Sequence, residues 1–196
     1  MEVVIVDSGG ANLASLRYAL ERLGARAEVS ADGSTIASAE RVVLPGVGAA
    51  AHAMTCLRAA GLINVLRTLT QPVLGICLGM QLLFERSAEG CTECLKVLPG
   101  AVEALEPAAE HPVPHMGWNE LRPLKPDPLL HGVARGAHAY FLHSYAAPMT
   151  EHTLASADYG RAVAAVVRRG NFWGTQFHPE RSSATGARVL ENFLAL

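Results

Sequence analysis

The sequence predicts an α/β protein with a mostly parallel, doubly wound central sheet to which antiparallel strands are added. Two observations predict this fold. Short apolar runs alternate with amphipathic stretches through the first half, whereas the second half holds β-type segments with few helices between them. The chain has 196 residues, of which 50% are hydrophobic and 17% charged, so it has ample material for a buried core and suits a single domain over residues 1–196.

The first half predicts the strands and helices of the parallel core. Strands are predicted at residues 3–6, 26–29, 41–44 and 73–76, each a compact run bounded by turn residues. Helices are predicted at 13–23, with Asn12 as N-cap and Gly24 as the stop, at 49–69 with a break near Gly61, and from Leu78 to Phe84. This order implies parallel strands that are covered on both faces.

The second half predicts additions to that core. Its β-type segments lie at 96–97, 102–105, 138–144, 162–167 and 172–177, and we interpret them as hairpins or edge strands. The proline-rich stretch 107–128 is predicted to be a loop. A last helix is predicted from about residue 184 to residue 196, because Val189, Leu190, Phe193 and Leu194 share one helical face.

Composition excludes several classes of function. The formal net charge is −2 and no dense run of lysine or arginine occurs, so a nucleic-acid partner is not expected. No apolar stretch is long enough to span a bilayer, and the first residues lack the basic start of a signal peptide. The four cysteines are therefore expected to be free thiols, in a protein of the cytoplasm.

The segment Gly75-Ile76-Cys77-Leu78-Gly79 joins a predicted strand to a predicted helix. This is the pattern of a nucleophile elbow with cysteine as the nucleophile. The glycines permit a sharp turn, and the start of a helix favours a thiolate at Cys77. The backbone N–H of Leu78 would face the oxyanion of a tetrahedral intermediate. The alternative is that Cys77 is only a small buried side chain between closely packed glycines.

A second segment, Gln176-Phe177-His178-Pro179-Glu180, supplies a base. Pro179 favours an extended backbone at His178, and in extended chain the side chains of His178 and Glu180 point the same way. The carboxylate would then hold the imidazole in one tautomer while its other nitrogen takes the thiol proton of Cys77. The alternative is a solvated surface turn.

These two segments, GICLGMQLL (75–83) and FHPE (177–180), resemble those of the class I, or triad, glutamine amidotransferases. Within that family, four further segments resemble the glutaminase subunits of imidazole glycerol phosphate synthase. They are GGANL (9–13), LPGVGA (44–49), PHMGWN (114–119) and YFLHSY (140–145). The resemblance implies a flavodoxin-like amidotransferase fold and hydrolysis of glutamine through a Cys77 thioester. It implies that ammonia passes to a separate (β/α)₈-barrel cyclase subunit, with no cofactor and no metal.

The resemblance also implies roles for individual residues. Those beside the oxyanion are Leu78, Val47 and Gly48, and those that contact glutamine are Gly46, Gln81, Glu89, His143, Ser144 and Tyr145. Those that face the cyclase are Asn12, His115, Met116, Trp118, Asn119 and Tyr140. Some have plainer alternatives, since Trp118 could be core and Gln81 a solvated helix residue. The chain departs from the family pattern at Ser8, where tyrosine is frequent, and at Arg181, where lysine is commoner.

Other signals carry less weight. Cys91 and Cys94 form a C-x-x-C pair with His111 and His115 downstream, but the intervening prolines argue against a zinc finger. The Gly9-Gly10 turn lacks the other glycines and the lysine of nucleotide-binding loops.

The sequence leaves three other functions open. The chain could be a related amidotransferase, such as a pyridoxal phosphate synthase glutaminase or an anthranilate synthase subunit, although PHMGWN argues against both. It could be a non-catalytic module, although all three triad residues are present. It could also be a thiol-dependent peptidase or γ-glutamyl hydrolase, which would need no partner.

Overall fold

A central sheet organises the molecule, as a computed structural model shows for residues 1–9 and 13–196. Within the described residues this sheet has eight strands. In spatial order they are β2 (Arg26–Ser30), β1 (Glu2–Val6), β3 (Arg41–Gly46), β4 (Val73–Cys77), β14 (Phe172–Thr175), β13 (Ala162–Arg169), β12 (Thr153–Asp158) and β9 (Arg122–Pro123). The strands from β2 to β14 are parallel, and β13, β12 and β9 continue the sheet in antiparallel pairing.

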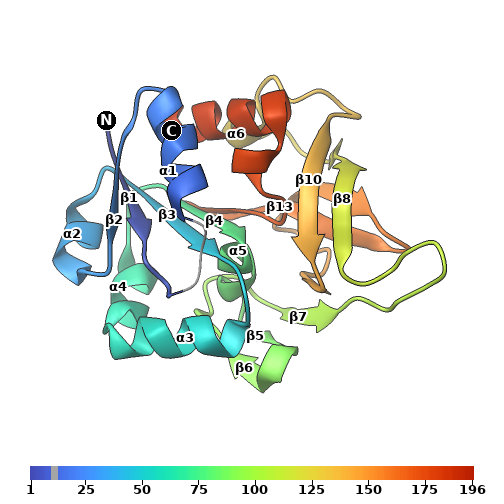
Figure 1. Ribbon diagram of the computed structural model, residues 1–196, viewed down its shortest axis with the longest axis horizontal. Coiled ribbons are helices and arrows are strands. Elements are labelled where there is room, and N and C mark those ends of the chain that lie inside the picture. Colours follow the sequence, from blue (N-terminus) through green and yellow to red (C-terminus); the bar gives the residue numbers. More distant parts are fainter. Residues whose placement is uncertain (10–12) are drawn as a thin grey trace.

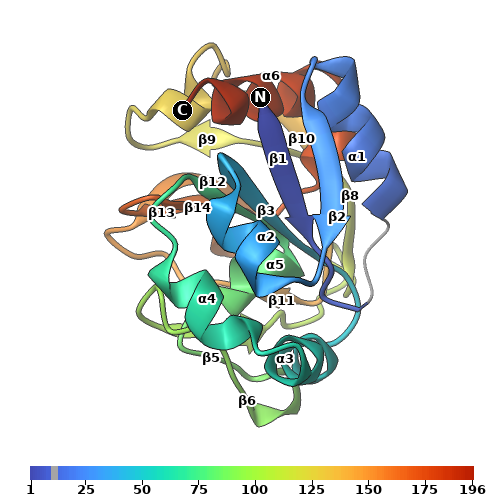
Figure 2. The same ribbon diagram turned by 90° about the vertical axis from the view of Figure 1, so that its left-hand side faces the viewer.

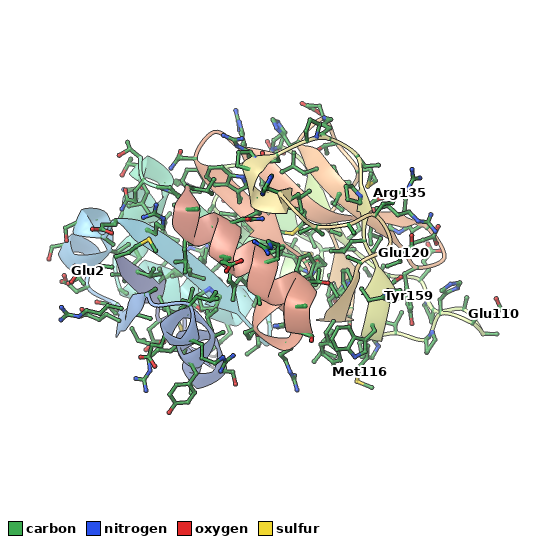
Figure 3. All side chains as sticks on the ribbon, turned by 90° about the horizontal axis from the view of Figure 1, so that it is seen from above. Glu2, Glu110, Met116, Glu120, Arg135 and Tyr159 are labelled. Carbon is green, nitrogen blue, oxygen red and sulfur yellow. The ribbon has the colours of Figure 1, made fainter. Side chains whose placement is uncertain are left out.

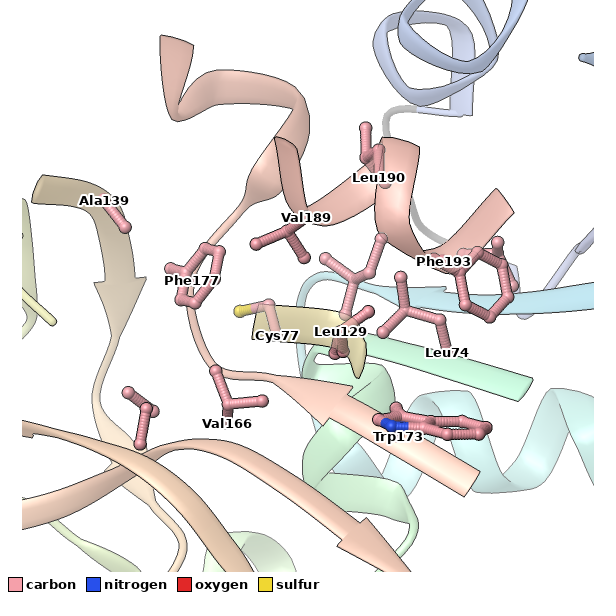
Figure 4. Close-up of a cluster of buried hydrophobic side chains, with 14 of the residues drawn as sticks. Leu74, Cys77, Leu129, Ala139, Val166, Trp173, Phe177, Val189, Leu190 and Phe193 are labelled. Atoms are coloured by element: carbon pink, nitrogen blue, oxygen red, sulfur yellow. The ribbon is translucent and has the colours of Figure 1, made fainter. Parts of the chain in front are cut away.

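Helices cover both faces of the sheet, as Figures 1 and 2 show. On one face lie α1 (Leu13–Arg22) and α6 (Ser183–Ala195), which bury Leu16, Leu20, Val189 and Phe193 in one hydrophobic cluster. On the other lie α2 (Gly33–Ser38), α3 (Ala50–Ala59), α4 (Leu62–Thr68) and α5 (Leu78–Leu82). Cys77 belongs to the first cluster and lies there near Phe177 and Val189 (Figure 4).

The fold class predicted from the sequence is confirmed. The predicted strands of the first half correspond to β1, β2, β3 and β4, and the predicted helix break near Gly61 separates α3 from α4. Gly61 has a φ of 69°, a left-handed conformation that favours glycine. Asn12, the predicted cap of α1, lies outside the described residues.

Two predictions for the second half were wrong, and a third was right only in part. Lys96 and Val97 are in irregular chain and not in a strand, and the N–H of Val97 donates to the carbonyl oxygen of Leu83, next to the end of α5. The stretch 107–128 is not only loop, because it contains β8 (His115–Glu120) and β9. The segment 172–177, predicted to be part of a hairpin or an edge strand, contains β14, which forms a hairpin with β13 but lies inside the sheet between β4 and β13. A parallel strand is usually preceded by a crossover helix, but the chain reaches β14 through the hairpin with β13. The sequence therefore lacks the usual signal that β14 is parallel to β4.

Two smaller β structures flank the C-terminal ends of the parallel strands. One is a ribbon of β8 and β10 (His138–His143), which stands at one side of the molecule in Figure 1. The other has the order β11 (Tyr145–Ala146), β7 (Ala101–Ala104), β5 (Arg86–Ser87) and β6 (Thr92–Glu93). Short 3₁₀ turns are η1 (Glu89–Cys91), η2 (Pro128–Leu130) and η3 (Pro179–Arg181). Among the described helices, none has both the length and the apolar character needed to cross a bilayer.

Candidate active site

Cys77 stands at a strained turn between β4 and α5. Its backbone φ is 55° and its ψ is −112°, values that few residues other than glycine adopt. The turn is possible because the backbone packs closely around it. A Cβ atom on Gly79 would lie 1.8 Å from the carbonyl oxygen of Leu44, and one on Gly75 would lie 2.7 Å from the carbonyl oxygen of Gly79. The elbow geometry predicted around Cys77 is therefore present.

We expect Gly79→Ala to destabilise the protein by about 2–3 kcal/mol, because the new methyl group overlaps the backbone of β3 and must displace it. Gly24→Ala is the control. Gly24 has a φ of 83° and open space around it, so that variant meets only the left-handed backbone penalty of about 1 kcal/mol. Urea denaturation of both variants measures the difference. Equal stability of the two variants would contradict the close approach at the elbow.

His178 and Glu180 meet as the sequence predicted, although by a different backbone path. The Nδ1 atom of His178 lies 2.9 Å from Oε1 of Glu180, and both side chains are about nine-tenths buried. His178 is extended, with φ −95° and ψ 98°, but Glu180 lies in the turn η3. The hydroxyl of Ser182 donates to the carbonyl oxygen of His178 at 2.7 Å and anchors that turn. The second carboxylate oxygen of Glu180 has no partner among the described residues.

The surroundings of His178 favour its charged form. Burial alone would lower the pKa of His178, but hydrogen bonds with Cys77 and Glu180, together with attraction to both groups, outweigh burial and raise that pKa to about 10. Glu180 holds Nδ1, so Nε2 is the nitrogen that faces the sulfur. The arrangement keeps a protonated imidazole beside the sulfur of Cys77.

A cavity of about 290 Å³ opens over Cys77. It brings together the predicted triad members Cys77 and His178 and most of the residues predicted to contact glutamine or its oxyanion. Its lining is Val47, Gly48, Cys77, Leu78, Gln81, Glu89, Pro114, Leu142, His143, Ser144, Tyr145 and His178. Gly46 is not part of this lining, but it is paired with Cys77 in the register of β3 and β4.

Two of these side chains also support the backbone. Gln81 is buried, and its Nε2 donates to the carbonyl oxygen of Tyr145 at 2.8 Å and to Oε1 of Gln176 at 3.0 Å, so it is not a solvated helix residue. A carboxylate oxygen of Glu89 accepts from the N–H of Ala50 at 2.7 Å, at the first residue of α3. Glu89 thus faces the cavity and also caps a helix.

Sequence reasoning missed Gln176 and Ser182. Gln176 is fully buried, and its Nε2 lies 3.9 Å from Sγ of Cys77. Its position in the strand-end segment before His178 was the available signal. The hydroxyl of Ser182 also accepts from the N–H of Tyr140, which ties the histidine turn to β10.

The loop predicted to supply an oxyanion donor lies beside Cys77. Val47 is 40% exposed and follows β3 directly. Ser8, where the sequence departs from the family pattern, is buried and donates its hydroxyl to the carbonyl oxygen of Pro45 at 3.1 Å. The short Ser8 side chain therefore restrains the start of the loop.

The residues predicted to face a partner divide into two groups. Met116 is 66% exposed and projects from the surface in Figure 3, and Trp118 is 53% exposed, so Trp118 is not core. Tyr140 packs edge-on against Trp118 with ring centroids 6.1 Å apart. His115 is instead buried, and Asn119 is partly buried. Asn12 lies outside the described residues.

The C-x-x-C pair does not form a common site. Cys94 is buried, which raises the pKa of its thiol to about 11, whereas Cys91 is exposed. In the described part of the chain, no group of three or more His, Cys, Asp or Glu side chains is arranged to hold a metal ion.

Comparison with known proteins gives full-length matches. A family model described as glutamine amidotransferase class-I matches residues 4–196. The "imidazole glycerol phosphate synthase subunit HisH" of Xanthomonas axonopodis pv. citri (strain 306) is 55% identical, over 100% of this chain and 98% of the relative. The subunit of the same name from Xylella fastidiosa (strain Temecula1 / ATCC 700964) is 54% identical over the same shares.

Solved structures share the fold at low sequence identity. A crystal structure of a glutamine amidotransferase superposes with a TM-score of 0.75 at 20% identity, over 98% of this chain and 97% of that one. The glutaminase domain of Trypanosoma brucei CTPS, with bound acivicin, gives a TM-score of 0.70 at 16% identity, over 100% and 92%.

Proposed function

The chain belongs to the class I glutamine amidotransferase family, and from this premise we propose that Cys77, His178 and Glu180 form its catalytic triad. The protein is the glutaminase subunit of an imidazole glycerol phosphate synthase, an enzyme of histidine biosynthesis. We also propose that the protein acts in the cytoplasm. The observation that carries the triad is the strained elbow, which puts the sulfur of Cys77 in the wall of a cavity that it shares with His178.

The first half of the reaction forms a thioester. The thiolate of Cys77 attacks the side-chain carbonyl carbon of glutamine, and the developing oxyanion is stabilised by the N–H of Leu78. His178 then donates its Nε2 proton to the leaving nitrogen, the C–N bond breaks, and ammonia departs. Glu180 remains ionised throughout, orients the imidazole through Nδ1 and stabilises its charge.

The second half releases glutamate. Water enters the space that ammonia has left, and neutral His178 removes a proton as the oxygen attacks the thioester carbonyl. The C–S bond breaks and the sulfur of Cys77 leaves as a thiolate beside protonated His178. The free site therefore returns to protonated His178 beside the sulfur of Cys77, the form that the partners of His178 favour against the effect of burial.

Glutamine-analogue labelling tests the triad directly. An electrophilic analogue such as a chloroketone should modify one cysteine per chain, at Cys77, and glutamine should protect it. Cys94 should stay unlabelled because it is buried with a raised pKa. Labelling elsewhere, with Cys77 unmodified, would overturn the triad. Cleavage of γ-glutamyl peptides by the chain alone would favour a stand-alone hydrolase instead.

The proposal includes a (β/α)₈-barrel cyclase as partner, seated on the outer face of the β8–β10 ribbon. Met116 and Trp118 are large apolar side chains exposed there, and Arg181 lies 5.1 Å from the ring centroid of Tyr140. An exposed aromatic cluster with an arginine is the composition that binding hot spots favour. This surface is close to the cavity, because residues of β10 line both. A partner bound there could receive ammonia before bulk water protonates it.

We expect the isolated chain to hydrolyse glutamine about 10²–10³-fold more slowly than the complex with cyclase and its ribonucleotide ligand. Leu78 provides one oxyanion donor, and the loop from Gly46 to Gly48 must provide the second. A missing donor costs about that factor in rate. Partner binding would shift the loop toward the state with its N–H pointing inward. Glutamate release is measured for the chain alone, with cyclase, and with cyclase plus ligand.

The control is ammonium-dependent turnover by the same cyclase, which bypasses the glutaminase site and should not change. Equal glutamate release in all three mixtures would refute this activation of the loop by the partner, which we call the switch. The switch and the triad are separable, because a constitutively active chain could still depend on Cys77.

A further inference from the structure

The β8–β10 ribbon carries different side chains on its two faces. On β8, the exposed residues Met116 and Trp118 alternate with His115 and Asn119, whose side chains point inward. On β10, His143 is paired directly with His115 in the strand register. The outer face is the one proposed above for the partner. The inner face holds two buried histidines that the reaction does not use as acids or bases.

The hydrogen bonds of these histidines fix where their protons lie. The carbonyl oxygen of Tyr145 can only accept, so Nδ1 of His143, 2.8 Å away, carries a hydrogen and donates it. In a neutral ring, Nε2 of His143 must then accept. Nδ1 of His115 lies 3.0 Å from that atom and so donates to it. The remaining nitrogen, Nε2 of His115, accepts from Nδ2 of Asn119 at 3.3 Å.

Both rings are neutral in this arrangement. Charging either one would place two N–H groups against each other or against the amide of Asn119. Burial lowers the pKa of His143 to about 3 and that of His115 to about 4. His115 is also clamped between two rings, with centroids 3.9 Å from Tyr159 and 4.8 Å from Phe141 in stacked geometry. Its plane, and therefore the direction of its Nδ1–H bond, is fixed by packing.

The chain of hydrogen bonds ends on the wall of the glutamine cavity. The Tyr145 carbonyl oxygen accepts from His143 and also from Gln81, which in turn contacts Gln176 beside Cys77. Residues Leu142 to Tyr145 are consecutive and all line the cavity. The Leu142 carbonyl oxygen lies 3.6 Å from Sγ of Cys77. This wall is thus held from two sides, by the histidine pair and by Gln81.

We propose that His115 is a positioning residue for glutamine, which holds His143 as the Nδ1–H tautomer and thereby fixes the cavity wall at Tyr145. The inference rests on the proposed function, since the cavity is taken to bind glutamine. It gives His115 a role inside the subunit. The residue touches neither the scissile bond nor Cys77, and its effect reaches the substrate through His143.

The kinetic test compares two substitutions in the complex with cyclase. His115→Phe keeps a flat ring between Tyr159 and Phe141 but leaves the buried acceptor of His143 unpaired. We expect the KM for glutamine to rise about 5- to 100-fold, the equivalent of one unsatisfied buried group, with a much smaller change in kcat. His115→Asn returns an N–H donor near the Nδ1 position and should recover most of the loss. Tyr159→Phe is the control, because it keeps the ring and removes only the bond to the Pro112 carbonyl.

Two further measurements keep the result interpretable. Nitrogen-15 NMR of the wild-type histidines should show the Nδ1–H tautomer at both His115 and His143, and an Nε2–H tautomer at either position overturns the inference even if a variant fails to fold. A folded His115→Phe protein with unchanged KM also overturns it. If the wild-type complex releases no glutamate at all, the proposed function fails, whereas the tautomers would still be found as assigned.

Discussion

Cys77→Ala is expected to abolish glutamine hydrolysis, with a loss on the order of 10⁶-fold, the scale seen when a triad nucleophile is removed. Alanine has no atom that can form the thioester, while the elbow and cavity remain. Cyclase activity supplied with ammonium salts should be unchanged, because the two reactions occupy different sites. Paired assays of glutamine- and ammonium-dependent turnover measure the separation.

The other cysteines are the controls. Cys56→Ala, Cys91→Ala and Cys94→Ala change thiols that do not line the cavity, so glutaminase activity should stay close to wild type. The pKa of His178 gives a second readout. Because Cys77 raises that pKa, the Cys77→Ala protein should show His178 titrating well below the value of about 10 that the intact pair gives. Glutamine-dependent turnover by the alanine variant would disprove the assignment.

His178→Ala is expected to reduce glutamine hydrolysis by at least about 10²–10⁴-fold, the range for loss of a general acid–base group. Alanine can neither accept the thiol proton nor protonate the departing nitrogen. Glu180→Gln should lose less, because the amide oxygen can still accept from Nδ1 and orient the ring, although it no longer stabilises the charge. Steady-state glutamate release in the cyclase complex gives both values.

The pH profile separates the two roles. In wild type the charge of Glu180 helps to keep His178 protonated, so removing that charge should lower the pKa of His178. The fraction of protonated His178 would then decline at a lower pH in Glu180→Gln than in wild type. A larger loss of activity in Glu180→Gln than in His178→Ala would require the roles to be exchanged.

Local sequence was enough to predict four of the five parallel strands, β1 to β4. The runs at 3–6 and 73–76 are short and continuous, as expected for strands buried on both faces, and they became β1 and β4. The elbow could be predicted because the nucleophile and the glycines that permit its turn lie within five consecutive residues, 75–79. In the proposed triad, Pro179 made the approach of His178 and Glu180 predictable even though the turn η3 was not.

The second half was harder because its strands depend on distant partners. β8 has the sequence HMGWNE, with glycine and asparagine where strand formers are expected, and pairing with β10 is what makes it a strand. β12, with the sequence TLASAD, was missed because its alanines fit a helix equally well. The link between His115 and the cavity was likewise beyond the sequence, since it depends on register and on which nitrogen carries each hydrogen.

The place of β14 has a consequence for how the protein is made. This strand is synthesised late, yet it sits in the interior of the sheet between β4 and β13. Until it emerges from the ribosome, β4 presents an open, apolar edge of the kind that pairs with other chains. The same strand leads to His178, and Gln176 contacts Cys77 across 99 positions of sequence. A truncated or nascent chain that lacks β14 is therefore expected to be both prone to aggregation and inactive. The pairing of β14 with β4 closes the sheet and also brings His178 to the proposed site.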